Sequence, residues 1–461
     1  MRKWCAVDET LAQLVTFVRT ADFATLDQRT VRAVIRHNLD AVGCGAGGFD
    51  SQPAEIARVV WGSGGELVAS VYGHEERATL NAAMLANATA NRYLDFNDFG
   101  PSGHPSDMMP GLLAVGEAFG RSGQDVVTAI YIAYEIANVL AELAPKARGR
   151  WDQGLFCSLG AGAGIAKLMR LTDAQTANAL SLSMVPSIPL RVTRTGELSD
   201  WKAMATAHAV VQAAMACQMA KLGLTGPGAV FEGPGGLFEM VTGPLDGSKL
   251  GMGEAAVSRT SLKKYAACYW SQTAIECVLA IRDRIEDPGA ITAIDVETFH
   301  AAWWTIGGGI GDVDEKWAPE TRETADHSMP YIVASAFLDG RIGMDTFAPE
   351  KLRSADRRRL MQLTSVSENK EYSDAVSKGQ YPTRVKVTLA DGREIVELCQ
   401  IPKGNNAMPM SDDEVGAKFD GLVADVLAQE DVNELRSRLW EFDQLTEIAE
   451  VTPLFRKFRR R

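Results

Sequence analysis

An aspartate and a histidine near each other in the chain are the first candidates for chemistry. Asp95 and Asp98 lie in the segment LDFND (94–98), and His104 follows Asp95 by nine positions. The glycines and prolines between them predict a loop, so both side chains can line one pocket. A carboxylate beside an imidazole orients the ring and sets its pKa, which suits proton transfer. The alternative is structural: the aspartates cap the chain, and His104 is a hydrogen-bonded loop residue.

Cations form the second candidate group. Lys202 opens an alanine-rich stretch that predicts a helix, and Arg191 and Arg194 precede it. A lysine on such an apolar background needs an anionic partner or a route to solvent. Near a carboxylate substrate it would anchor that group, and if partly desolvated it could act as an acid or base. A solvated first helical turn explains the same residues equally well.

Two later segments add further candidates. Lys263 and Lys264 lie where we expect a domain boundary, although a solvated charge pair is the commoner explanation. In DHSMPY (326–331), Ser328 and Pro330 predict a helix start. The N-terminus of that helix favours a carboxylate, and Tyr331 could donate a hydrogen bond to it. A simple helix start explains this segment except for the tyrosine hydroxyl.

Other patterns point away from cofactors. GAGAG (160–164) lacks the preceding strand and the downstream acidic residue of a dinucleotide fold, so we interpret it as close helix packing. GPGAVFEGPGG (226–236) lacks the GK[ST] of a phosphate loop and predicts an irregular loop. The sequence contains neither HExxH nor a His/Cys cluster. It therefore predicts no nucleotide cofactor and no metal.

Composition limits the class of protein that positions these residues. The net charge of −12 argues against a binder of nucleic acid or anionic membranes, because both need a basic surface. No run approaches the ~18 uninterrupted apolar residues of a membrane helix, and the segment 1–13 turns polar too early for a signal peptide. The seven cysteines are scattered and form no CxxC pair. These features predict a reduced, cytoplasmic protein.

Length and the spacing of apolar residues predict two domains. A chain of 461 residues exceeds the ~250–300 residues that one core can serve. From residue 8 to about 225, apolar residues recur at helical steps. After a predicted helix at 271–285, ITAIDVETFH (291–300) alternates like a strand, and TRVKVTLADGREIVELCQI (383–401) predicts a hairpin that turns at Asp391 and Gly392.

We therefore predict a mainly α protein. It has a large all-helical domain (1–262), a smaller α+β lid domain (263–402), and C-terminal helices (403–461) that return to the helical domain. The cleft between the two domains is the expected place for a site.

Seven segments together resemble the MmgE/PrpD family. They occur in family order over nearly the whole chain, and this ordered combination is far more specific than any single match. The segments are HNLDAVGCGAGG (37–48), NAAMLANATANRYLDFND (81–98), HPSDMMPGLLAVGEAFGRSG (104–123), GELSDWKAMATAHAVVQAAMACQMAKLGLTGPGAVFEG (196–233), SLKKYAACYWSQTAIE (261–276), DHSMPYIVASAFLDGRI (326–342) and YPTRVKVTLADGRE (381–394).

The resemblance implies a fold, an assembly and a site. The fold is a large helical domain with a smaller α+β lid, and the assembly is usually a homodimer. The site lies between the domains and needs no metal or organic cofactor. The family's Asp, His, Lys and Tyr fall on Asp95, His104, Lys202 and Tyr331, with Lys263 as a further cation.

Two positions depart from the family pattern. Trp151 begins the segment WDQ where family members often carry His-Pro-Thr, and Trp270 lies where the dehydratases have a histidine. We expect both tryptophans to line the substrate pocket. A pocket that loses two potential cations and gains indole bulk predicts a smaller or less charged substrate.

The expected protein is a cofactor-independent enzyme for a small anionic carboxylate. Lys202, Lys263 and Arg191 hold the carboxylates of the substrate. His104, oriented by Asp95, moves a proton at the carbon next to a carboxylate.

The fate of the charge that then develops decides the reaction. Cations and Tyr331 are expected to stabilise this enediolate-like charge. Loss of a β-hydroxyl makes a dehydratase of a hydroxy di- or tricarboxylic acid, which is the first expectation. An epimerase or isomerase of a dicarboxylate such as iminodisuccinate is the second, and a cis-aconitate-type decarboxylase is the third. A carboxylate-binding protein without catalytic activity is an alternative of another class.

Overall fold

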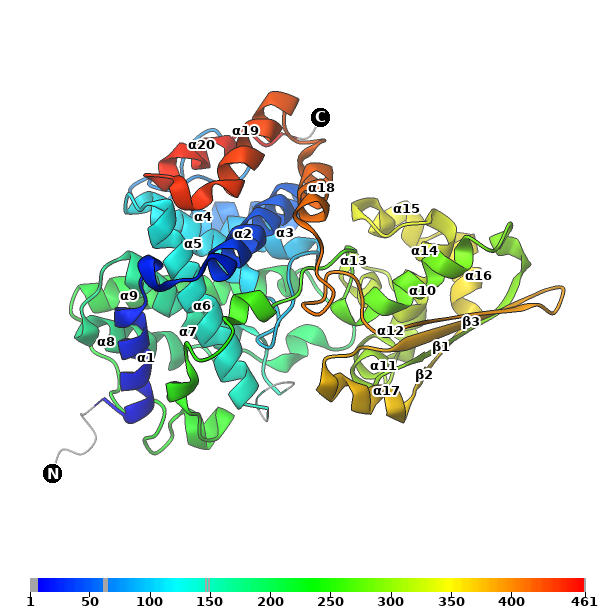
Figure 1. Ribbon diagram of the computed structural model, residues 1–461, viewed down its shortest axis with the longest axis horizontal. Helices are drawn as coiled ribbons and strands as arrows, with labels where there is room; N and C mark the ends of the chain where they lie inside the picture. The colour runs from blue at the N-terminus through cyan, green and yellow to red at the C-terminus, as the bar shows by residue number, and fades with distance from the viewer. Residues whose placement is uncertain (1–6, 61–64, 146, 148–149, 460–461) are drawn as a thin grey trace.

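Two hydrophobic cores lie side by side in the molecule (Figure 1). The computed structural model describes residues 7–60, 65–145, 147 and 150–459, so Cys5 lies outside the described residues. One core unites apolar residues of 11–262 with those of 410–458, and the other uses residues 265–389. Helices dominate, and the described residues form one small sheet. The predicted mainly α class is confirmed.

Close helix packing builds the first core. Helix α6 begins at a capping box of Ser122 and Asp125 and lies against α7. A Cβ on Gly160 or Gly164 would come within 2.5 or 2.7 Å of a backbone oxygen of α6, so GAGAG is a helix-packing surface, as predicted. The helices of this part are α1 (Glu9–Thr20), α2 (Gln28–Gly48), α3 (Gln52–Val60), α4 (Leu80–Tyr93), α5 (Met109–Ala118), α6 (Gly123–Leu143), α7 (Gly154–Leu168), α8 (Asp173–Met184) and α9 (Trp201–Lys221).

The C-terminal segment completes this first core. Helices α18 (Asp412–Val423), α19 (Gln429–Trp440) and α20 (Thr452–Phe455) lie beside α2 to α5 in Figure 1, and α18 and α19 pack on α2. Phe419, Val423 and Leu435 are fully buried there.

A four-stranded sheet organises the second core. The strands β1 (Ile291–Thr298), β2 (Thr364–Glu368), β3 (Thr383–Leu389) and β4 (Glu394–Cys399) have the order β2-β1-β3-β4. The predicted strand and hairpin are confirmed as β1 and β3–β4, which pair antiparallel. β2, which pairs parallel with β1, was not predicted, because its sequence TSVSE is short and mostly polar.

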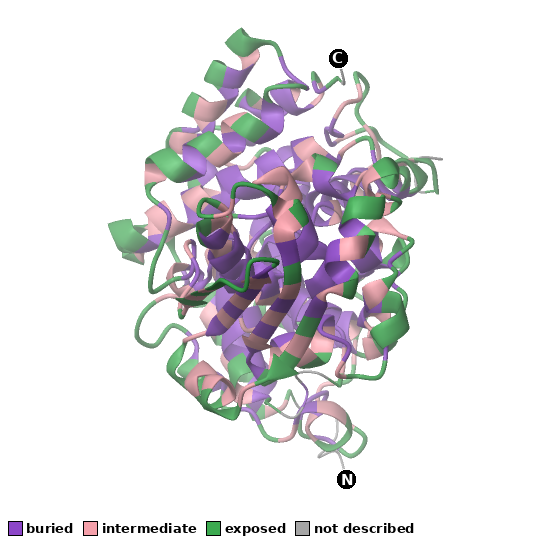
Figure 2. Cartoon of the chain, turned by 90° about the vertical axis from the view of Figure 1, so that its right-hand side faces the viewer, coloured by how far each residue is buried: buried purple, intermediate pink, exposed green. Residues whose placement is uncertain are grey.

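Helices surround this sheet. α10 (Gln272–Arg282) packs on β3 and β4 and contacts α14 (Met329–Asp339), which in turn contacts α16 (Ala355–Gln362). Figure 2 views this part end-on and shows buried residues in its middle with exposed residues around the edge. The shorter helices are α11 (His300–Ile306), α12 (Val313–Trp317), α13 (Arg322–Ala325), α15 (Pro349–Leu352) and α17 (Lys370–Ala375).

One described helix, α6, is long and apolar enough to cross a membrane by composition alone, but 83% of its most apolar stretch is buried inside the molecule. It is a core helix. The six described cysteines are free thiols, and all but Cys399 are buried.

Candidate active site

The loop after α4 is held in shape by one buried carboxylate. Asp98 accepts hydrogen bonds from the backbone N–H of Ser106 (3.1 Å), the Ser106 hydroxyl (2.6 Å) and the Tyr134 hydroxyl (2.7 Å). These bonds fold residues 98–106 back on themselves. The loop thereby brings His104 next to Asp95, as the spacing in the sequence predicted.

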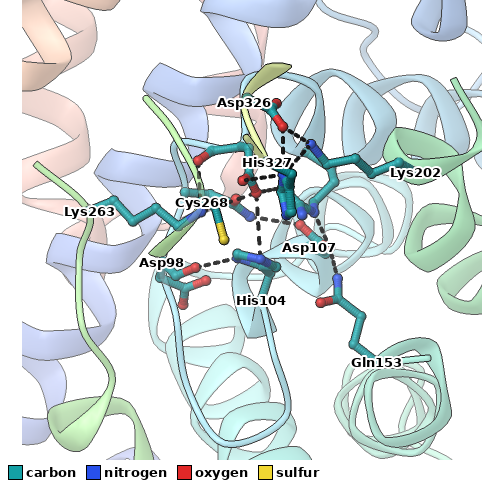
Figure 3. A network of polar contacts seen from close by, with 12 residues as sticks. Asp98, His104, Asp107, Gln153, Lys202, Lys263, Cys268, Asp326 and His327 are labelled. Carbon is teal, nitrogen blue, oxygen red and sulfur yellow. Dashed lines mark hydrogen bonds and ion pairs between the residues drawn. The ribbon is translucent and has the colours of Figure 1, made fainter. Parts of the chain in front are cut away.

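Asp95 lies within ion-pair distance of His104, Lys263 and His327, which are labelled in Figure 3. Its backbone is left-handed, with φ 49°, a conformation that aspartate tolerates better than most residues. Lys263 fixes this conformation, because its ammonium lies 2.8 Å from the Asp95 carbonyl oxygen and 3.1 Å from Oδ1. Arg92 also contacts Oδ1. Burial alone would raise the pKa of Asp95, but Arg92, Lys263 and Lys202 hold it well below its usual value.

His104 has one ring nitrogen bound and one free. Nδ1 lies 2.6 Å from the carbonyl oxygen of Asp98, so it must carry the proton and donate it. Nε2 then has a free lone pair, 3.6 Å from Asp95 Oδ1. Burial, with the charges of Arg92 and Lys263, holds the pKa of His104 well below its ordinary value. The backbone of Asp98, rather than the predicted Asp95, therefore orients the ring.

A second histidine approaches Asp95 from the other core. His327 Nδ1 lies 2.6 Å from Asp326 Oδ1 and 3.7 Å from Asp95 Oδ2. Lys202 Nζ lies 2.5 Å from the same oxygen of Asp326 and 3.2 Å from His327 Nδ1. Because the ionised Asp326 can only accept, His327 donates from Nδ1. Burial and the Lys202 charge lower the pKa of His327 to about 4.

The cluster keeps an excess of positive charge. Burial would raise the pKa of Asp326, but Lys202 and His327 lower it, so this carboxylate is ionised like Asp95. Burial lowers the pKa of Lys202 and of Lys263, yet each ammonium touches a carboxylate that stabilises its charge. The cations Arg92, Lys202, Lys263 and Arg322 thus outnumber the carboxylates that they contact, Asp95, Asp107 and Asp326. Such a site attracts an anion.

A cavity of about 600 Å³ opens onto this cluster. Its lining comes from both cores, as expected for a site between two domains. Of the predicted residues, Asp95, His104, Arg191, Trp151 and Trp270 line it. Lys202 and Lys263 do not line it and act on it through their contacts with Asp326 and Asp95.

Comparison with known proteins follows the same division of the chain. The family model of the MmgE/PrpD N-terminal domain matches residues 12–248, and that of the MmgE/PrpD C-terminal domain matches residues 265–442. The chain belongs to the MmgE/PrpD family.

Its relatives include several dehydratases. The chain is 27% identical to 2-methylcitrate dehydratase of Escherichia coli K12, over 67% of each chain. It is 25% identical to 2-methylcitrate dehydratase of Cupriavidus necator, over 86% of each chain. It is 26% identical to the alkylcitrate dehydratase phiI of a fungal species, over 71% of this chain and 70% of the relative.

The structure places Tyr331 away from this cavity. Its hydroxyl donates to the carbonyl oxygen of Thr346 at 2.8 Å, and its ring stacks on Phe347 inside the second core. Tyr331 is fully buried and does not line the cavity. The expectation that its hydroxyl stabilises substrate charge is therefore corrected. Ser328 does cap α14, as predicted, and this cap turns the side chains of the first helical turn into the core.

Three residues of the candidate site were not predicted from the sequence. His327 lies just before the helix cap Ser328 and lines the cavity. The residue predicted from this segment was Tyr331, which follows the cap. Arg92 lines the cavity and lies three positions before Asp95, a spacing that brings two helix-end side chains together. Asp98 was given no role of its own beyond the alternative that both aspartates cap the chain, and its carbonyl contact with His104 has no signature in side-chain type.

Two carboxylates and one imidazole of the cluster are spaced closely enough to hold a metal ion. Asp95, Asp326 and His327 each offer a ligand atom within 4.8 Å of the others. However, the Lys202 ammonium already lies between Asp326 and His327. With a cation of the protein in this position, the cluster favours an anionic ligand.

Proposed function

We propose that this chain is a hydro-lyase that dehydrates a hydroxy di- or tricarboxylic acid. The observation that carries the proposal is the free Nε2 of His104, held neutral beside Asp95 in a cavity with surplus positive charge. A neutral imidazole with one nitrogen anchored is suited to act as a general base.

The proposed reaction starts at the carbon next to a carboxylate. Arg92, with Lys202 and Lys263 behind the carboxylates, attracts the substrate carboxylate. His104 Nε2 takes the proton from the neighbouring carbon, and the Asp95 carboxylate stabilises the imidazolium that forms. The electron pair of the C–H bond becomes the C=C bond as the β-hydroxyl leaves. The hydroxide combines with the proton held by His104 and is released as water.

The dehydratase names of the relatives support this choice. They also name citrate derivatives as their substrates, so we propose an acid of that class here. Because the identities are 27% or lower, the names of the relatives do not fix the substituent on the acid. The side chains that line this cavity select it.

A second candidate is epimerisation, which the two histidines favour. His104 and His327 each approach a different oxygen of Asp95, and both are neutral when buried. Two such bases could remove a proton from one face of a carbon and return one to the other face.

Proton NMR in D₂O distinguishes these functions. The protein is incubated with hydroxy-, amino- and unsaturated di- and tricarboxylates, beginning with 2-methylcitrate. We expect deuterium next to a carboxylate together with an unsaturated product. Exchange with inversion and no loss of water would indicate the epimerase, and release of CO₂ the decarboxylase.

The control is His104→Gln, which keeps the size and polarity of the side chain but removes the base. We expect its exchange rate to fall by about 10²–10⁴-fold while binding persists. If acids that bind the unmodified protein show no exchange, the catalytic proposal fails and a carboxylate-binding protein remains.

We further propose that the enzyme acts as a cytoplasmic homodimer. Val185, Leu190 and Val192 are apolar side chains that are more than half exposed, and a second copy could cover them. The free thiols agree with a reducing compartment. Light scattering after size-exclusion chromatography tests the dimer, and a monomeric mass at micromolar concentration would contradict it.

A further inference from the structure

An aromatic wall lies next to the proposed base. The rings of Phe99 and Tyr269 stack at 4.2 Å, and Trp270 packs edge-on against Phe99 at 4.8 Å. The Phe99 ring also lies 5.9 Å from the ring of His104. All four residues line the cavity. A substrate whose reacting carbon meets His104 therefore has an apolar surface beside that carbon.

The apolar lining continues to the mouth of the cavity. Trp304 is 42% exposed and Ile310 is 38% exposed, although both line the cavity. Trp151 and Trp270 are half-buried. Covering these side chains would remove apolar surface from water, which is favourable in proportion to the area covered.

Arg191 adds a further cation to the lining of the cavity. It is not among the cations that contact Asp95. Among the described residues, Arg191 has no hydrogen-bond or ion-pair partner, whereas the neighbouring Arg194 is bound to Asp152 at 2.8 Å. The free guanidinium can hold a second carboxylate, and the aromatic wall contributes the apolar surface of the same cavity.

We propose that the acid bound here is not the smaller substrate expected from the sequence but carries a hydrocarbon substituent larger than methyl, which lies on the wall formed by Phe99, Tyr269 and Trp270. Its carboxylates contact the cation cluster and Arg191. The cavity volume of about 600 Å³ equals that of about twenty waters at ~30 Å³ each, more room than a compact polyacid fills. The proposal rests on the proposed function for the reaction, but its claim about binding can be tested without turnover.

The test uses 2-alkylsuccinates with methyl, butyl and octyl chains. These dicarboxylates lack a hydroxyl and cannot be dehydrated, so calorimetry reports binding alone. We expect the dissociation constant to fall about two- to fourfold for each methylene that reaches the wall. A constant that is independent of chain length, or that rises with it, would overturn the proposal.

Variants locate the effect. Trp270→His should flatten the dependence on chain length, because it removes the indole from the wall, whereas Trp270→Phe should keep most of the dependence. Trp440→His is the matched control, because this half-buried tryptophan lies on α19 away from the cavity. Trp304→Ala alters an exposed side chain and gives a second result if Trp270→His does not fold. Chain-length dependence unchanged in both wall and rim variants would contradict the proposal.

Failure of this proposal differs from failure of the proposed function. Tight binding of long-chain acids without exchange on any hydroxy acid would keep the hydrocarbon site and remove the hydro-lyase. Exchange and dehydration without a preference for longer chains would do the reverse.

Discussion

At the scale of single residues, the two ring nitrogens of His104 have different tasks. Nδ1 is committed to the Asp98 carbonyl and keeps the ring in place. Nε2 lies 3.6 Å from Asp95 Oδ1, so this carboxylate can stabilise the imidazolium once Nε2 is protonated. Burial, with the charges of Arg92 and Lys263, opposes protonation of the ring, so His104 is available as a base.

The lowered pKa of His104 predicts how exchange depends on pH. A base works only when it is unprotonated, and this ring stays unprotonated as the pH falls through 6.5. We expect the rate constant for deuterium exchange, measured as kcat/KM from pH 5 to 8, to hold through pH 6.5 and to decline at lower pH. A midpoint at or above 6.5 for the free enzyme would contradict this assignment.

His327 predicts an acid-dependent loss of stability. Its pKa is about 4 in the folded protein and about 6.5 in an unfolded chain. Between these values the unfolded state binds more protons, so the free energy of unfolding falls as the pH drops from 6.5 toward 4. The loss from this residue is on the order of 3 kcal/mol. Denaturant unfolding of the unmodified protein and of His327→Gln at pH 7 and pH 5 should show a smaller decrease in the variant, and equal decreases would refute the role.

The site residues could be predicted from the sequence more easily than the directions of their side chains. Asp95 and His104 could be chosen from their types and spacing, and Lys202 because it interrupts an alanine-rich stretch. Lys263 could be chosen from its place at the expected domain boundary and from the family resemblance. Tyr331 and His327 lie within one short segment, and only the turn before α14 decides which faces the cavity. The role of Asp98 depends on a backbone carbonyl, which every residue has.

At the scale of elements, helix α18 reaches into the site through Lys418. Its ammonium contacts the carbonyl oxygens of Phe96 (2.7 Å) and Lys263 (2.9 Å) and the Asp40 carboxylate (2.6 Å). One of these carbonyls follows Asp95 directly, and the other belongs to the lysine that holds Asp95. Lys418 thus positions both sides of the central carboxylate.

Lys418→Met should lower activity and stability for separable reasons. Loss of the carbonyl contacts displaces Asp95 and Lys263, and we expect exchange to fall about ten- to a hundredfold in kcat. Asp40 is left as a buried, unpaired carboxylate, which we expect to cost about 3 kcal/mol. In the double variant Asp40→Asn, Lys418→Met, thermal unfolding should recover in part while kcat stays low. Recovery of both would show that Lys418 supports the fold alone.

Elements with strong periodicity were predicted well, and weak ones were not. β1 and the strands of the β3–β4 hairpin alternate in polarity. The hairpin turns at Asp391 and Gly392, where Gly392 has φ 85°. β2 has no such alternation of polarity. Its strand conformation depends on its pairing with β1. Tertiary contact of this kind cannot be seen in five residues of sequence.

At the scale of the molecule, Arg322 joins the two cores at the site. It donates to the carbonyl oxygen of Tyr93 at 2.8 Å and to that of Leu94 at 3.4 Å, where α4 ends. It also pairs with Asp326 at 3.3 Å. The end of the helix that carries Arg92 and the segment that carries His327 are therefore held in register by one side chain.

The first core depends on residues from both ends of the chain. A protein that ends at residue 402 would lack α18 to α20 and expose the surface of α2 that they cover. We expect it to lose its cooperative thermal transition and to aggregate. Addition of a separately made 403–461 segment should restore the transition, and a cooperative transition in the truncated protein alone would contradict the expectation.

This arrangement has a consequence for synthesis on the ribosome. Residues 1–262 emerge before residues 263–402, and the helices that close their core emerge after both. The nascent chain must therefore carry an open helical bundle while the sheet-containing half is being translated. Lys418 belongs to that later segment, so the Asp95 carboxylate gains this support only after the sheet-containing half has been translated.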